Sequence, residues 1–216
     1  MAIDVNRRVT NRIERYSPGG NLDHTAKLYR AMAAVRHPQV VAHTDRVALL
    51  AEKIAITLGK DSKAAFFAGL LHDFGKIVLP DTLFDGHDIS GDEYAEIKTH
   101  AISGFDILGE FHMFTAMCAG LHHALYHRGY GLTIDDFPKG ITLPLIKKVL
   151  ETATIVSICD FIDAYTHRKT KLKHSPASKG KSEGKTLREL LLAQYPGDAQ
   201  LIDLALEANQ EFAEVA

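Results

Sequence analysis

The hydrophobic positions of this chain recur at three- and four-residue steps, which is the spacing of amphipathic α-helices. The clearest example follows Pro38 and runs to Gly59, with an apolar face made of Val40, Val47, Leu50, Ile54 and Leu58. The same periodicity covers residues 3–16, 22–35, 62–73, 90–108, 111–126, 144–166, 185–194 and 198–214. No segment alternates between apolar and polar residues as a half-buried strand does. We therefore expect an all-α protein built as a helical bundle.

Turn-forming residues separate these segments. Ser17, Pro18 and two glycines divide the first two helices, and Ser90 is placed to open the helix over 90–108. Residues 168–185 are rich in lysine and lack aromatic residues, which is typical of a flexible basic surface loop. We divide the chain into an N-terminal helical extension over residues 1–36 and a main domain over residues 37–216.

Composition narrows the class of protein. The chain has 216 residues, 46% hydrophobic and 24% charged, with a formal net charge of −2, so nothing favours binding to nucleic acid or to a membrane. No run reaches the roughly 20 apolar residues of a membrane span, and residues 1–16 are too polar for a signal peptide. We expect a cytoplasmic protein, with Cys118 and Cys159 reduced in the core. Twelve histidines exceed what a purely structural protein needs.

The most informative segment is LLHDFGKIVLP, residues 70–80, which sets His72 beside Asp73 at the end of an apolar helix. Imidazole nitrogen and carboxylate oxygen are both good ligands for Zn, Fe or Mn. Adjacent helical side chains diverge by about 100°, so the pair can reach two points of one cavity. An ionised Asp in a leucine-rich segment also needs a cation or a hydrogen-bonding partner.

Five other residues are candidate ligands, and each has a structural interpretation when taken alone. His43 on an apolar face is more often a hydrogen-bonded core residue, and His100 suits a surface or a helix end. His122 and His123 suit a helix C-terminus, where a positive charge is favourable. Asp160, in an apolar helix, is the hardest to explain without a partner.

The combination favours a metal centre. Each candidate lies on or ends an apolar helix, and such ligands converge where helices of a bundle pack together. No thiolate belongs to the set, which argues against a structural zinc site of the cysteine type. A carboxylate such as Asp73, with histidines on both sides, suits a bridge between two metal ions.

The order H…HD…H…HH…D, carried by LLHDFGK, THAISGFDIL, LHHALYHRGYG and ICDFIDAYTHRK, resembles the HD superfamily of metal-dependent phosphohydrolases. The resemblance covers about residues 38–170 and is greatest to the HD-GYP branch. It implies an HD-domain helical bundle that includes residues 37–216.

Several positions depart from the HD-GYP pattern. Ala101 replaces a proline, Ala124 and His127 replace the Glu and the Asp of the paired-histidine motif, and Gly131 makes the GYP motif degenerate. Gln39 occupies the position where members with three metals supply a glutamate, so the resemblance implies two metals. The same departures weaken the case for cyclic di-GMP as the substrate.

The resemblance implies a role for each candidate ligand. The first metal would be held by His43, His72, Asp73 and Asp160. The second would be held by Asp73, His100 and His122, with His123 close by as a ligand or a hydrogen-bonding neighbour. The cofactors would be two divalent transition metal ions, Fe, Mn or Zn.

The resemblance also indicates residues for catalysis and substrate binding. Asp73 and Lys76 would be catalytic, with Lys76 contacting the substrate phosphate, and Asp163 would orient a ligand histidine. Arg168 and Lys169 lie where the family has an arginine near another phosphate. For these two, a solvated loop is an equally good interpretation.

We therefore expect an enzyme that hydrolyses a phosphoester in a nucleotide or another phosphorylated small molecule, such as a cyclic dinucleotide, and a homodimer is compatible with the sequence. One alternative is an HD oxygenase with a mixed-valent di-iron centre, which uses the same ligand set. Another is a catalytically weak HD-GYP-like domain used for binding or regulation.

Overall fold

The computed structural model describes residues 4–127, 129–167 and 184–215 of the chain. Its helices and 3-10 turns are, in order, α1 (Val5–Tyr16), α2 (Asn21–Arg36), α3 (Pro38–Thr57), α4 (Ser62–Leu71), η1 (Phe74–Val78), η2 (Asp81–Phe84), α5 (Gly91–Lys98), α6 (His100–Gly109), α7 (Met113–Leu121), η3 (Ile134–Asp136), α8 (Leu143–His167), α10 (Leu187–Gln194) and α11 (Ala199–Val215). No strand occurs in these ranges, so the all-α prediction is confirmed.

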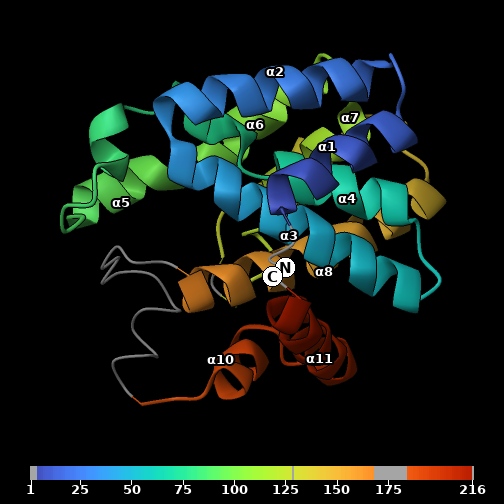
Figure 1. Ribbon diagram of the computed structural model, residues 1–216, viewed down its shortest axis with the longest axis vertical. Coiled ribbons are helices and arrows are strands. Elements are labelled where there is room, and N and C mark those ends of the chain that lie inside the picture. Colours follow the sequence, from blue (N-terminus) through green and yellow to red (C-terminus); the bar gives the residue numbers. More distant parts are fainter. Residues whose placement is uncertain (1–3, 128, 168–183, 216) are drawn as a thin grey trace.

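The helix α3 lies at the centre of the bundle and packs against α1, α2, α4, α8 and α11 (Figure 1). On one side, Val9, Ile13 and Tyr29 of α1 and α2 share a buried cluster with Leu49 and Phe66. On the other side, a second cluster joins α3, α4, α7 and α8 to α10 and α11. The helices that carry the predicted ligands therefore contribute to two apolar clusters, which hold them in place.

Local side-chain chemistry sets the helix ends. Pro38 is the first residue of α3, where its missing N–H is not needed, and Gly59 follows the helix at a φ of 63° that favours glycine. The Asp61 carboxylate accepts a 2.9 Å hydrogen bond from the backbone N–H of Ala64 at the start of α4. Ser90 begins α5 with a capping box. These caps fix where each helix stops.

The structure corrects two predicted helices. The segment 90–108 is divided at Thr99, whose hydroxyl donates to the Glu96 carbonyl at 2.7 Å, so α6 begins anew at His100. The segment 111–126 stops at Leu121, because the chain then turns back and the Tyr130 N–H donates to the His123 carbonyl at 3.1 Å. Both corrections place histidines at helix ends.

Two glycines allow η1 to lie against α6. A Cβ on Gly75 would lie 2.0 Å from the His100 carbonyl oxygen and 2.6 Å from the Gly104 nitrogen. No side chain fits there, so glycine is required for this backbone approach. The contact places the residue pair His72 and Asp73 beside the start of α6.

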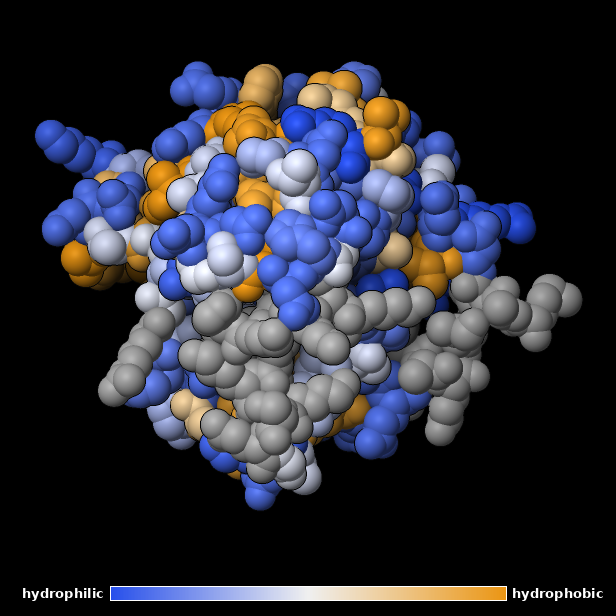
Figure 2. All heavy atoms as spheres, turned by 90° about the vertical axis from the view of Figure 1, so that its left-hand side faces the viewer, coloured by the Kyte–Doolittle hydropathy of each residue, from blue (hydrophilic) through white to orange (hydrophobic). Residues whose placement is uncertain are grey.

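Cys118 and Cys159 are buried and free, as predicted. In the part of the chain that the structure describes, no helix combines the length and the apolar character needed to cross a lipid bilayer. The face shown in Figure 2 is mainly hydrophilic, with apolar residues in separate places.

Candidate metal centre

The seven predicted ligands come together at one place in the bundle. His43 lies in α3, His72 and His122 follow the last residues of α4 and α7, His100 begins α6, and Asp160 lies in α8. These residues, together with Asp73 and His123, offer donor atoms to three overlapping groups, each with atoms within 4.8 Å of one another.

The first group is formed by His43, His72 and Asp160. The Nε2 atom of His43 lies 3.3 Å from Nε2 of His72 and 3.2 Å from Oδ1 of Asp160. His72 and Asp160 are buried, and the His43 side chain is only 12% exposed. One cation between these atoms would have two nitrogen donors and one oxygen donor.

The second group is formed by His100, His122 and His123. The Nε2 atoms of His100 and His122 are 3.3 Å apart, and both residues are buried. His123 is less buried, and its Nδ1 atom has no hydrogen-bond partner. This group therefore offers three imidazole nitrogens.

Asp73 lies between the two groups. Its Oδ2 atom is 3.5 Å from Nε2 of His43 and 3.4 Å from Nε2 of His72, whereas Oδ1 is 3.2 Å from Nε2 of His100. The carboxylate is buried, and Oδ1 has no hydrogen-bond partner. Lys76 donates from its ammonium to Oδ2. One carboxylate thus faces both histidine groups, as a bridging ligand must.

Three of the histidines are held in one tautomer by the backbone. The Nδ1 atoms of His72, His100 and His122 lie 2.8, 2.6 and 2.5 Å from the carbonyl oxygens three residues earlier. A carbonyl only accepts, so each Nδ1 must carry the proton. In its neutral form, each ring with this tautomer presents the lone pair of Nε2 toward Asp73. Such outward hydrogen bonds are typical of metal-binding histidines.

His43 is oriented by a side-chain network. Its Nδ1 atom lies 2.7 Å from Oδ2 of Asp163, and Arg46 donates two hydrogen bonds to the same carboxylate at 2.6 and 2.8 Å. Arg46 is not among the residues predicted from the sequence. Its position three residues after His43 on one helix was the available signal.

The ionisation of these groups follows from burial and neighbouring charges. Burial, followed by the nearby His72 and His100, lowers the pKa of His122 to about 3. Burial and the adjacent His122 also hold the pKa of His123 well below its ordinary value. Both rings are neutral near pH 7, which is the state that binds metal.

The two buried carboxylates are ionised. Burial raises the pKa of Asp73, but the Lys76 ammonium and the neighbouring imidazoles of His72 and His100 outweigh it and place the pKa well below its ordinary value. For Asp160 burial is likewise outweighed, mainly by the hydrogen bond with His43. His43 shows the converse: burial lowers its pKa, but Asp160 and Asp163 raise it to about 9. The site therefore combines ionised carboxylates with the neutral rings of His122 and His123, whereas His43 carries a proton near pH 7 that a bound metal would displace.

These donors fit divalent metal ions. The facing Nε2 atoms of His100 and His122 carry no protons in their neutral tautomers, so their lone pairs point at one another across 3.3 Å. A buried carboxylate oxygen of Asp73 without a partner lies beside them. A bound cation would give each of these three atoms a partner, whereas an apolar side chain in its place would leave all three without one.

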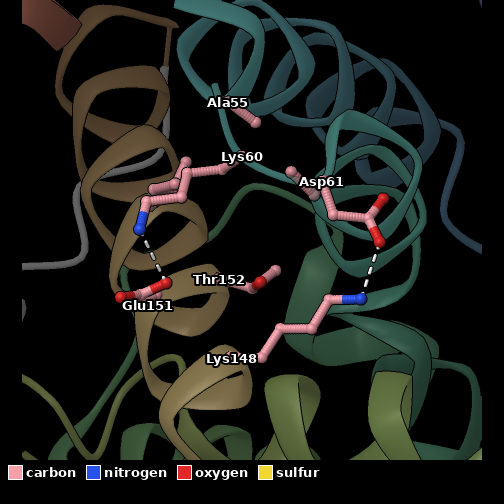
Figure 3. Close-up of a pocket in the computed structure, with 8 residues that line it drawn as sticks. Ala55, Lys60, Asp61, Lys148, Glu151 and Thr152 are labelled. Atoms are coloured by element: carbon pink, nitrogen blue, oxygen red, sulfur yellow. Dashed lines mark hydrogen bonds and ion pairs between the residues drawn. The ribbon is translucent and has the colours of Figure 1, made fainter. Parts of the chain in front are cut away.

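Two predicted substrate contacts, Arg168 and Lys169, lie outside the described residues. A separate small pocket of about 50 Å³ lies between the end of α3, the start of α4 and the first half of α8 (Figure 3). Its charged residues are paired as Lys60 with Glu151 and Lys148 with Asp61. It has room for a few water molecules and none for a nucleotide.

The HD domain family profile matches residues 40–165, more than half of the chain and all seven candidate ligands. This chain belongs to the HD domain family. The HD domain predicted from the motifs is thus confirmed, whereas its placement in the HD-GYP branch stays a prediction.

Relatives of this HD domain include phosphodiesterases. It is 25% identical over 195 residues to a cyclic di-GMP phosphodiesterase of Thermotoga maritima, covering 88% of this chain and 50% of that protein. The chain thus spans about half the length of this curated relative.

The fold is also similar to the HD domain of the L. monocytogenes phosphodiesterase PgpH. The TM-score is 0.53 at 20% identity, over 83% of this chain and 94% of that domain. The same domain in complex with cyclic-di-AMP has a TM-score of 0.53 at 19% identity, over 83% and 93% of the two chains. At these identities the likeness concerns the fold alone.

Proposed function

We propose that this HD domain is a metal-dependent phosphodiesterase that hydrolyses a cyclic dinucleotide or a related nucleotide phosphoester. The observation that carries the proposal is Asp73, a buried carboxylate that faces histidine nitrogens on both sides and has the Lys76 ammonium on its edge. The relatives named as phosphodiesterases, one of them crystallised with cyclic-di-AMP, support this class of substrate.

Two divalent transition metal ions would bind at this centre. The first would be held by His43, His72 and Asp160, the second by His100 and His122 with His123 nearby, and both by Asp73. Gln39 occupies the position where members with three metals supply a glutamate, and its amide donates to the carbonyl of Phe84 at 3.0 Å. Because this side chain is engaged with the backbone, it supports two metals rather than three. When bound, the metals would activate water and neutralise phosphoryl oxygens by Lewis acidity.

The side chains of this chain supply the remaining functions. Histidines held in one tautomer keep their Nε2 donors directed inward, so little reorganisation accompanies the reaction. The Lys76 ammonium would attract a non-bridging phosphoryl oxygen and stabilise the negative charge that accumulates there. Arg168 and Lys169 would contact a second phosphate, consistent with a substrate that carries two.

The test is an anaerobic hydrolysis assay. Protein loaded with Mn²⁺ or Fe²⁺ is incubated under argon with cyclic di-AMP and with cyclic di-GMP, and nucleotide products are separated by chromatography. We expect linear dinucleotide or nucleoside monophosphate to form without O₂. Turnover that strictly requires O₂ and releases no such product would favour the di-iron oxygenase. Metal binding without any turnover would favour the regulatory domain.

A second measurement examines Lys76. Lys76→Ala is expected to keep its full metal content, because an ammonium group is not a ligand, while kcat falls about 100-fold through loss of one stabilising charge. Metal content by elemental analysis, beside kcat, separates the two effects. Unchanged kcat in this variant would contradict the role of Lys76.

A further inference from the structure

Three buried or partly buried hydroxyl groups lie immediately behind the candidate ligands, and the mechanism above does not use them. They belong to Tyr126, in the turn after α7, to Ser157, one turn before Asp160 in α8, and to Tyr195, the residue that ends α10.

Tyr126 contacts a candidate ligand directly. Its hydroxyl donates to Oδ2 of Asp160 at 3.2 Å, whereas the other oxygen, Oδ1, lies 3.2 Å from Nε2 of His43. The ring of Tyr126 is fixed in turn by edge contacts with Phe161 and Tyr195, at centroid distances of 5.9 and 5.4 Å. The hydroxyl therefore occupies one oxygen of the carboxylate and leaves the other facing the histidines.

Ser157 and Tyr195 act on the end of α7. The Ser157 hydroxyl donates to the backbone carbonyl of His122, one of the terminal carbonyls that a helix leaves without a partner. The Ser157 proton is used there, so Tyr195 must donate to the Ser157 oxygen across their 2.7 Å contact. The relay of Tyr195, Ser157 and His122 ties the end of α7 to α8.

Tyr195 comes from outside the part of the chain that the family profile matches. That match ends at residue 165, and Tyr195 follows α10. The backbone N–H of His127 donates to the Gln194 carbonyl at 3.0 Å, which holds the end of α10 against the turn that carries Tyr126. A segment beyond the matched region therefore reaches the surroundings of the metal centre.

We propose that Tyr126 and Tyr195 are positioning residues of this HD domain, the first for Asp160 and the second, through Ser157, for His122. The proposal rests on the metal centre of the proposed function. The hydrogen bond of Tyr126 acts on the first group through Asp160, although its ring also lies 5.1 Å from that of His123, and Tyr195 acts on the second group through His122. Each tyrosine is therefore expected to affect mainly the affinity of a different metal. The helix α10 is on this account part of the support of the metal centre.

The chain offers a matched control in Tyr16. Its hydroxyl also donates to a buried carboxylate, Glu52, at 2.6 Å. Glu52 lies nine residues, about 13 Å, beyond His43 along α3. Tyr16→Phe thus removes the same kind of hydrogen bond away from the candidate ligands.

The experiment is a titration of the 216-residue chain with Mn²⁺, measured by calorimetry and by elemental analysis. Tyr126→Phe is expected to weaken one of the two sites about tenfold, the usual effect of losing a hydrogen bond to a ligand, and excess Mn²⁺ is expected to restore kcat. Tyr195→Phe is expected to weaken the other site. Tyr16→Phe is expected to lower the melting temperature and leave both Mn²⁺ affinities unchanged.

The outcomes separate this inference from the proposed function. Wild-type Mn²⁺ affinities in Tyr126→Phe would overturn the role assigned to Tyr126, and wild-type affinities in Tyr195→Phe would overturn the role assigned to α10. Mn²⁺ binding that weakens as expected in a chain with no hydrolase activity would support the inference and contradict the proposed function. A wild-type chain that binds no Mn²⁺ would overturn both.

Discussion

At the residue scale, the candidate centre depends on which atom of each ring points inward. The backbone carbonyls of Gly69, Ile97 and Ala119 accept hydrogen bonds from Nδ1 of His72, His100 and His122, respectively. Asp163 faces Nδ1 of His43. Asp73 then lies among Nε2 atoms on both sides. Removing it takes away the ligand that both groups share.

Asp73→Ala is therefore expected to lose both metals and all metal-dependent activity, since no adjacent carboxylate replaces it. The matched control is Glu52→Gln, which alters another buried carboxylate, paired with Arg12 at 2.6 Å. The control is expected to be less stable by about 1–3 kcal/mol with unchanged metal content. Elemental analysis of both variants measures their metal content, and thermal unfolding measures their stability. Two bound metals in Asp73→Ala would rule out the bridging role.

Sequence reasoning selected the candidate ligands because charged and polar side chains at the ends of apolar helices need partners. It missed their supporting residues for physical reasons. Arg46 resembles any exposed arginine until its contact with Asp163, 117 residues away, is known. Tyr195 reaches Ser157 only because α10 packs against α8, and no local pattern encodes that contact.

At the element scale, periodicity predicted the helices well and their ends less well. Apolar spacing continues through Thr99 and past Leu121, so the pattern alone joined α5 to α6 and extended α7. The actual ends coincide with local hydrogen bonds, such as that of the Thr99 hydroxyl, which the apolar pattern does not encode. These ends are functionally important, because each places a histidine in the centre.

The contact between η1 and α6 leads to a prediction. Gly75→Ala is expected to push α6 away, because the new Cβ would meet the His100 backbone, and to cost at least about 1–3 kcal/mol of stability. Binding of the metal nearer His100 is expected to weaken more than binding of the other. The control is Gly91→Ala, at a position with open space and expected to be neutral. Thermal unfolding and Mn²⁺ titration of the pair test this, and equal stability of the two variants would contradict it.

At the scale of the whole molecule, the candidate ligands come from three α-helices, α3, α6 and α8, and from the turns that follow α4 and α7, and two apolar clusters hold these helices together. The proposed extension over residues 1–36 contributes Val9, Ile13 and Tyr29 to one of these clusters. We therefore propose that it folds together with the rest of the chain. Metal bound between the helices would stabilise the entire bundle.

Metal addition is accordingly expected to raise the melting temperature. A ligand at 100 times its dissociation constant adds about 2.7 kcal/mol, which for a chain of this size corresponds to about 5–10 °C. Differential scanning calorimetry with Mn²⁺ and with a chelator measures the shift. Asp73→Ala should show none, and an equal shift in that variant would place the metal elsewhere.

The position of the donors at helix ends has a consequence for how such a protein can diversify. His72 and His122 follow the last residues of α4 and α7, so the loops that leave the centre begin only after the donors have been placed. Insertions or substitutions in these loops can reshape the entrance while the helices keep the donors where they are. A chain built in this way can change the molecule that it accepts and retain the chemistry that acts on it.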